Sequence, residues 1–221
     1  MTLRSGSKST TIFLLRHAHS EANLRGTLSG RKAGVNLSDV GKKQAAELIE
    51  RLGTLKIQEI HYSPLERCFQ TIEPFLRANP KIPAVSEPAF VEMDYGKWSG
   101  LKLSLLSKKK LWSTIQQSPS RVRFPEGESF TEMSARVLEG LEKLRGDGKV
   151  HLVVSHGDVI RVALNHYLGS QLDNFQRLSV DPASISALSF HGDSVRINFI
   201  NSTVSVSTHN NSTLGGGSGK P

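Results

Sequence analysis

The sequence predicts a three-layer α/β/α fold in which a mostly parallel central sheet is covered by helices on both faces. Short apolar runs that suit buried strands alternate along the chain with longer runs whose apolar residues recur at helical spacing. Two of the apolar runs end on a histidine, at His17 and at His156, where α/β proteins place functional side chains. The 221 residues, 37% hydrophobic and 22% charged, fit a single domain of this class.

The expected strands are short and alternate with the expected helices. The strands cover residues 10–15, 59–62, 84–85, 150–154, 184–190 and 195–200, and the last two form a hairpin around His191, Gly192 and Asp193. The helices cover residues 39–52, 64–78, 128–144 and 158–168, with a broken helix at residues 101–117. A turn-rich loop at residues 23–37 is expected to lie over a strand end.

Local signals set some of the helix boundaries. Ser38 is expected to cap the helix at residues 39–52, because serine oxygen accepts from the free N–H groups of a first turn. Ser63 is expected to cap the next helix, with Pro64 at its first position, which places Arg67 in the first turn. Pro74 falls inside that helix and is expected to kink it or end it early.

The two ends of the chain differ from the rest in composition. Residues 201–221 are rich in Ser, Thr, Asn and Gly, and we expect a flexible tail there. Residues 1–9 are expected to be a flexible N-terminus, and they lack the apolar segment of a secretory signal. The folded domain is therefore expected to span residues 10–200.

Composition also bounds the class of protein. The net charge of +8 is spread along the chain, and the run at residues 108–110 suits a solvated helix face better than a nucleic-acid footprint. No apolar run is long enough to cross a membrane. The single cysteine, Cys68, is expected to be a small buried hydrophobe. These features predict a cytoplasmic protein with no nucleic-acid or membrane partner, and they leave open a homodimer.

The strand-end residues predict a site for a phosphate dianion. Arg16, His17 and His156 lie at neighbouring strand ends, and Arg67 lies in the first turn of a helix. Guanidinium groups match phosphate oxygens with a planar fork, and helix N-termini add backbone donors. A neutral imidazole in such a pocket can attack phosphorus while its neighbours stabilise the charge on the oxygens.

Five motifs in order carry a resemblance to a known family. They are LRHAHSEAN at residues 15–23, LSG at 28–30, YSPLERCFQT at 62–71, EMDYGKWSG at 92–100 and SHGD at 155–158. Together they resemble the histidine phosphatase superfamily, in the branch that contains phosphoglycerate mutases, over about residues 10–200. The resemblance implies a phosphoglycerate mutase-like fold and a cap segment at about residues 97–127. Ala18 departs from the glycine that most of the family has there.

The resemblance also implies roles for individual residues. His17 would be the nucleophile that becomes phosphohistidine, and Glu92 would be the proton donor. Catalysis would rest on Arg16, His17, Arg67, Glu92 and His156, and substrate contacts on Arg16, Asn23, Ser29, Gly30, Arg67, His156 and Gly157. The family's chemistry needs no metal ion and no cofactor, so none is expected.

Several residues have competing interpretations. Asp94 competes with Glu92 as the acid, although it is better placed to fix a turn, and Arg67 could merely pair with a glutamate near its helix. A metal site built from His17, His19 and His151 is disfavoured, because strand alternation separates His151 from His156. Structural and functional interpretations both stay open for Trp98, Arg121 and Arg123. Asp158 is expected to be a helix cap, with orientation of a neighbouring arginine as the alternative.

The sequence as a whole predicts a phosphatase that hydrolyses phosphate monoesters of small molecules through a phosphohistidine. The short segment between Glu92 and His156 implies a smaller cap than the glycolytic mutases have, which favours a phosphatase over a phosphomutase. The phosphomutase remains an alternative, as does a non-catalytic protein that binds a phosphorylated ligand. A nucleic-acid binder is a more distant one. The leaving group depends on residues 101–123 and is left open.

Overall fold

The computed structural model describes residues 9–205, and within that range a six-stranded sheet forms the centre of the molecule. Its spatial order is β3-β2-β4-β1-β5-β6. The strands are β1 (Thr10–Arg16), β2 (Glu59–Tyr62), β3 (Ala84–Ser86), β4 (Val150–Ser155), β5 (Ile185–His191) and β6 (Ser194–Ser202). The first four run parallel to one another, and the β5–β6 hairpin adds antiparallel strands beside β1.

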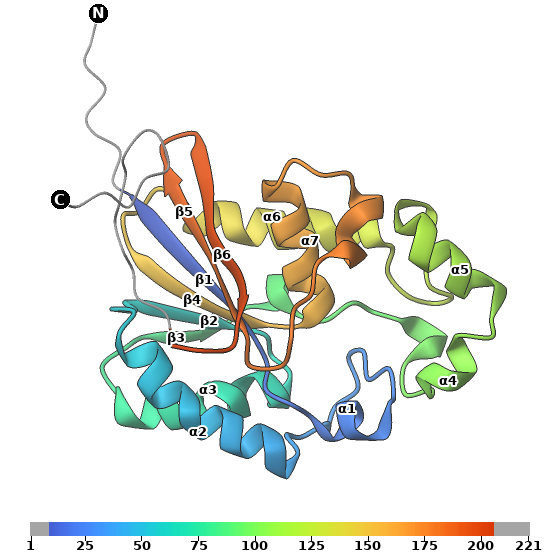
Figure 1. The fold of residues 1–221 in the computed structure, drawn as a ribbon, viewed down its shortest axis with the longest axis horizontal. Coiled ribbons are helices and arrows are strands. Elements are labelled where there is room, and N and C mark those ends of the chain that lie inside the picture. The colour runs from blue at the N-terminus through green and yellow to red at the C-terminus, as the bar shows by residue number, and fades with distance from the viewer. Residues whose placement is uncertain (1–8, 206–221) are drawn as a thin grey trace, which may run out of the picture.

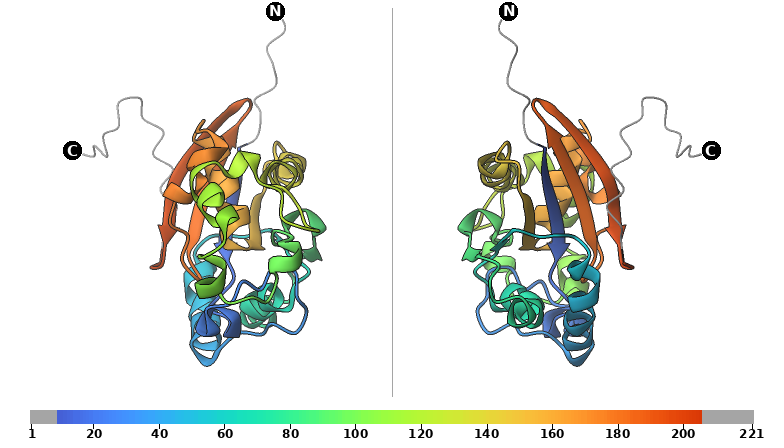
Figure 2. Two further views of the ribbon diagram at one scale, coloured as in Figure 1. Left: turned by 90° about the vertical axis from the view of Figure 1, so that its right-hand side faces the viewer. Right: turned by 90° about the vertical axis from the view of Figure 1, so that its left-hand side faces the viewer.

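Helices cover both faces of this sheet, as the sequence predicts. The α-helices are α1 (Glu21–Arg25), α2 (Asp39–Gly53), α3 (Glu66–Ala78), α4 (Leu103–Leu106), α5 (Lys110–Gln117), α6 (Phe130–Leu144) and α7 (Gly157–Tyr167). Four short 3-10 helices join them among the described residues: η1 (Pro88–Phe90), η2 (Gly96–Trp98), η3 (Pro119–Arg121) and η4 (Leu172–Arg177). Figure 1 shows α2 and α3 on one side of the sheet and α6 and α7 on the other. Figure 2 shows the β5–β6 hairpin along one flank of the molecule.

Alternation along the strands divides the core in two. Phe13 and Leu15 of β1 point to the side of α2 and α3, while Ile12 and Leu14 point to the side of α6 and α7. The second core continues beyond the sheet into the cap segment through Leu106, Ile115 and Phe124. The cap segment is therefore packed on the same core as the strands that carry the predicted site.

Two helix caps explain where their helices begin. Ser38 Oγ accepts from the Gly41 N–H at 3.2 Å, so α2 begins after Ser38 as predicted. The expected helix at residues 128–144 begins at Phe130 instead, because Ser129 forms a capping box with Glu132. In that box the Glu132 N–H donates to Ser129 Oγ at 3.2 Å and Glu132 Oε2 accepts from the Ser129 N–H at 2.9 Å.

Two local predictions are wrong, at residue 23 and at Ser63, while the helix around Pro74 ends where it was expected to end. The predicted loop at residues 23–37 starts inside the short helix α1, which Ser20 and Asn23 cap reciprocally. Ser63 does not cap α3, which begins at Glu66, because its hydroxyl contacts His156 instead. Helix α3 contains Pro74 and still runs on to Ala78, the expected end, because its apolar face is buried against the sheet.

Other boundaries agree with the sequence or lie outside the described residues. The expected broken helix at residues 101–117 is α4 followed by α5, with the break at residues 107–109. Strand β6 continues to Ser202, so the expected tail at 201–221 begins inside a strand, and residues 206–221 lie outside the described part. Residues 1–8 of the expected N-terminal segment also lie outside it. Between residues 9 and 205, no helix is long and apolar enough to cross a membrane.

Helix α2 lies very close to the loop after β1, so one methyl group added at Gly41 should strongly destabilise the protein. A Cβ added at Gly41 would lie 1.9 Å from the carbonyl oxygen of His19, whereas one added at Gly53 in the same helix meets nothing within 4 Å. We expect Gly41→Ala to lower the free energy of unfolding by about 1–3 kcal/mol, because backbone must shift to accept it. Gly53→Ala is the control and should be neutral or stabilising. Urea unfolding measures both, and equal stabilities would contradict the prediction.

Candidate active site

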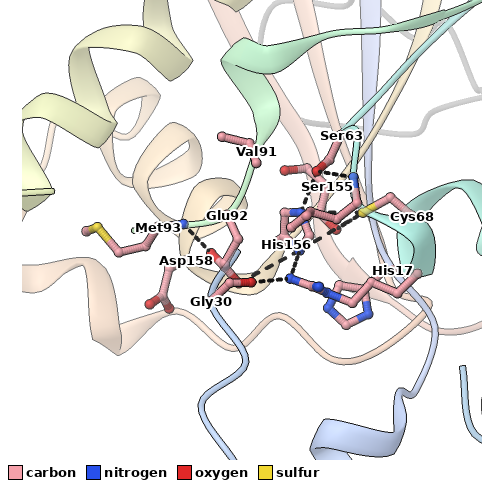
Figure 3. A network of polar contacts seen from close by, with 12 residues as sticks. His17, Gly30, Ser63, Cys68, Val91, Glu92, Met93, Ser155, His156 and Asp158 are labelled. Carbon is pink, nitrogen blue, oxygen red and sulfur yellow. Dashed lines mark hydrogen bonds and ion pairs between the residues drawn. The ribbon is translucent and has the colours of Figure 1, made fainter. Parts of the chain in front are cut away.

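The predicted histidines meet at the carboxyl ends of the two central parallel strands. Arg16 pairs with Ser155 in the β1–β4 register, so His17 and His156, the next residues along each strand, are neighbours. Their ring centroids lie 5.2 Å apart at an interplanar angle of 61°. Both rings are buried, and Figure 3 shows both of them to one side of Glu92. Strand pairing alone therefore builds the centre of the site.

The protonation state of His17 follows from its neighbours. Its Nδ1 lies 2.7 Å from the Ala18 carbonyl oxygen, which can only accept, so Nδ1 carries the hydrogen. Burial lowers the pKa of His17 well below its ordinary value, and the nearby charges of Arg67 and Arg16 lower it further. The ring is neutral, and its Nε2 keeps a free lone pair.

Ser63 and Arg67 hold His156 from two sides. The Arg67 guanidinium donates to His156 Nδ1 at 3.2 Å, so the other ring nitrogen carries the hydrogen and donates to Ser63 Oγ at 2.7 Å. Burial lowers the pKa of His156 well below the ordinary range, followed by the charge of Arg67. The Cys68 thiol lies behind the same ring, with Sγ 3.5 Å from Nε2. Cys68 is fully buried, as predicted.

Two arginines bring buried donors that lack acceptors. Arg67 is 0% exposed and donates through one terminal nitrogen to the Gly30 carbonyl oxygen at 2.9 Å, so it does not merely pair with Glu66 or Glu73. Its Nε and other terminal nitrogen have no hydrogen-bond partner among residues 9–205, and neither does Nε of Arg16. Buried guanidinium donors are normally satisfied, so these nitrogens are free to donate to an anion in the pocket.

Glu92 is the carboxyl group nearest to the two histidines. One oxygen accepts from the Met93 N–H at 2.9 Å, and the other lies 3.8 Å from His156 Nδ1. Burial raises the pKa of Glu92 to about 7, and the neighbouring Asp158 carboxylate adds to the rise. Asp94, the alternative acid, accepts from the Gly96 N–H at 2.9 Å and so fixes the turn.

These groups open onto a pocket of about 260 Å³. Its inner end is polar, and its outer wall combines apolar side chains of the cap segment with the polar Gln116 and Gln176. Among the sequence-predicted residues, those in the lining are Arg16, His17, Asn23, Ser29, Glu92 and Gly157. The others, Gly30, Arg67 and His156, are not part of the lining, and Arg67 contacts both Gly30 and His156. A Cβ added at Gly157 would lie 3.4 Å from the Arg16 guanidinium, an ordinary van der Waals contact, so this glycine packs directly against that group.

Sequence reasoning missed the main contacts of two positioning residues. Asp158 was expected to cap α7 or, as the alternative, to orient a neighbouring arginine; His156 occupies the cap position, and Asp158 lies in the first turn, where it pairs with Arg161. Its carboxylate accepts from Tyr95 Oη at 2.7 Å and from Arg161 at 3.0 Å, and it lines the pocket. Ser63 was assigned to a helix cap instead of to His156. Both residues lie within three positions of a strand end, and that position was the available signal.

Of the remaining candidate residues, one lines the pocket and the others lie outside it. Trp98 lines the pocket, whereas Arg121 and Arg123 do not, and Arg123 pairs with Glu132. His19 lies in the loop after β1, where its Nδ1 is 2.8 Å from Ser38 Oγ. His151 lies near the opposite end of β4 and contacts His61, so the structure does not bring His17, His19 and His151 together.

Known proteins that are similar to this chain point to one family. Residues 12–203 match the model of the histidine phosphatase superfamily (branch 1). The chain is 32% identical over 184 residues to phosphoserine phosphatase 1 of Hydrogenobacter thermophilus, covering 80% of this chain and 85% of the relative. It is 26% identical over 175 residues to a 2,3-bisphosphoglycerate-dependent phosphoglycerate mutase of Thermoplasma acidophilum, covering 79% and 84%.

A solved structure agrees in fold. The α-ribazole phosphatase from Shigella flexneri superposes with a TM-score of 0.78 at 24% identity, over 87% of this chain and 96% of that one. The family model spans the sheet, the cap segment and every residue of the pocket. With a relative of more than 30% identity over most of both chains, this chain belongs to branch 1 of the histidine phosphatase superfamily.

Proposed function

We propose that the protein hydrolyses phosphate monoesters of small molecules, with His17 as the nucleophile that carries the phosphoryl group. One observation carries the proposal: a neutral imidazole with a free lone pair lies beside buried arginine nitrogens that lack acceptors. A phosphoryl group supplies acceptors for these donors and an electrophile for His17 at the same time. The membership of phosphatases in the family supports the same conclusion.

In the first step, His17 Nε2 attacks phosphorus and the ester P–O bond breaks. Arg16 and Arg67 stabilise the charge on the phosphoryl oxygens, and His156 is held against them by Ser63. Glu92, protonated at a pH up to about 7, gives its proton to the departing oxygen. The products of this step are an alcohol and a phosphohistidine.

In the second step, water attacks the phosphohistidine. The Glu92 carboxylate left by the first step takes a proton from the water, and the N–P bond breaks to release phosphate and restore neutral His17. The raised pKa of Glu92 suits both directions of proton transfer near neutral pH. None of the steps requires a metal ion or another cofactor.

The outer wall of the pocket favours leaving groups with an apolar face. Leu103, Trp112 and Ile115 of the cap segment form the apolar part of this wall. Arg161, the basic side chain beside it, is held by Asp158 and by the Leu178 carbonyl oxygen. A phosphoglycerate would bring a carboxylate to this wall, which supports a phosphatase over a phosphomutase. The proposed setting is the cytoplasm, in keeping with one buried cysteine and a small pocket that suits metabolites better than nucleic acid.

The proposal is tested by replacing the nucleophile. We expect His17→Ala to remove phosphate release from a panel of phosphate monoesters by more than about a thousandfold, because no covalent intermediate can form. The wild-type protein, quenched during turnover, should carry an acid-labile phosphoryl group on His17, and its initial rates should be the same with EDTA. Retention of most activity by the variant would refute the mechanism. An adduct with transfer to a second hydroxyl, but no free phosphate, would identify a phosphomutase.

Asp158 should set the pH range of the reaction. Glu92 must be protonated to assist an alkyl leaving group, so kcat/KM for an alkyl phosphate should fall as the pH rises through about 7. Asp158→Asn removes a negative charge that raises the pKa of Glu92, so the fall should begin at a lower pH. An aryl phosphate needs little proton assistance and serves as the control. A fall at unchanged pH in the variant would contradict this role of Asp158.

Trp112 should contribute to substrate preference. Trp112→Ala removes apolar area from the outer wall, so KM should rise about tenfold for an aryl or long-chain alkyl phosphate. Phosphoserine, whose leaving group is small and polar, is the matched control substrate and should change little. Equal effects on both substrates would mean that this wall does not select the leaving group.

A further inference from the structure

A second group of chemically active side chains lies at the end of the sheet opposite to the active site. Glu59 of β2 pairs in register with His151 of β4, and His61 lies two residues along β2 on the same face. His61 Nε2 is 3.2 Å from His151 Nδ1 and 3.8 Å from Glu59 Oε1. One ligand atom from each residue lies within 4.8 Å of the others.

The separation of the two imidazole nitrogens suits a common cation, and Glu59 Oε1 lies somewhat farther out, 3.8 Å from His61 Nε2. A tetrahedral Zn²⁺ with bonds of about 2.0–2.2 Å to imidazole nitrogen and carboxylate oxygen places its ligand atoms about 3.3–3.6 Å apart. His151 is 1% exposed and His61 7%, so both rings are fixed by the packing around them. The Glu59 side chain is 23% exposed, which leaves a route from solvent. The group is therefore compact, mostly buried and accessible from one side.

The neighbouring residues orient the ligand atoms. Both carboxylate oxygens of Asp147 lie 3.1 Å from His151 Nε2, so that nitrogen carries the hydrogen and Nδ1 presents its lone pair to the group. Lys149 Nζ lies 2.9 Å from Glu59 Oε2, which leaves Oε1 facing His61. Histidines that bind metal ions usually donate their second ring N–H to a carboxylate or carbonyl oxygen, which fixes the orientation of the ring.

We propose that Glu59, His61 and His151 bind a divalent transition-metal ion of the zinc type, at a site separate from the phosphatase centre. Imidazole nitrogen with a carboxylate oxygen is a donor set that favours zinc, copper or nickel over magnesium or calcium. The negative charges of Glu59 and Asp147 outweigh the positive charge of Lys149, so the group attracts a cation. The bound ion would link β2 to β4 and stabilise the native sheet, because the ligands come together only in the folded chain.

The test compares zinc binding by the full chain and by matched variants. After treatment with EDTA and its removal, ZnCl2 is titrated at pH 7.5 by calorimetry, with the melting temperature recorded in parallel. His61→Gln and Glu59→Gln each remove one ligand, whereas His17→Gln removes an imidazole that could bind zinc in the active site. His166→Gln controls for zinc on a surface histidine.

The wild type, His17→Gln and His166→Gln should each bind one equivalent with micromolar or tighter affinity and melt at a higher temperature with zinc. His61→Gln and Glu59→Gln should bind at least about tenfold more weakly and lose the shift in melting temperature. Unchanged binding in both ligand variants, loss of binding only in His17→Gln, or no binding by the wild type would overturn the proposal. Phosphate release by His61→Gln is expected to equal that of the wild type, so the two proposals fail independently.

Discussion

The parallel pairing of β1 with β4 is the constraint on which the active site depends. Because Arg16 and Ser155 are register partners, the residues that follow them, His17 and His156, emerge side by side. Strand β2, on the other side of β4, brings Ser63 to the same edge of the sheet. The three strands are held by buried apolar side chains on both faces, so the geometry of the histidines is fixed by the core and not by flexible loops.

Burial then sets opposite protonation states in neighbouring groups. Removing water disfavours any charge, so it keeps His17 unprotonated and Glu92 protonated. The charges of Arg16 and Arg67 strengthen the effect on His17 and oppose it on Glu92, where the Asp158 carboxylate counteracts them. A nucleophile with a lone pair and an acid with a proton can therefore coexist at the same pH. This is the combination that attack on a phosphate ester requires.

The sequence predicted those parts of the molecule that depend on local periodicity and on strand ends. The sheet, the helices on its two faces and the meeting of His17, His156 and Arg67 follow from such patterns. The contacts of Ser63 with His156 and of Asp158 with Tyr95 do not follow from such patterns. A serine before a proline and an aspartate near a helix start both have common local explanations. The tertiary contacts to His156 and Tyr95 override them. The adjacency of His61 and His151 depends on strand register, which one strand's sequence does not contain.

The reactivity of Cys68 reports on local opening of the folded protein. It is the single cysteine of the chain, and burial raises the pKa of its thiol to about 12. A thiol-reactive reagent therefore meets neither an accessible sulfur nor a thiolate in the native state. Modification requires that α3 separate from the end of β4, the same motion that would release His156. The rate of Cys68 alkylation therefore measures how often this part of the catalytic centre opens, and no label has to be introduced.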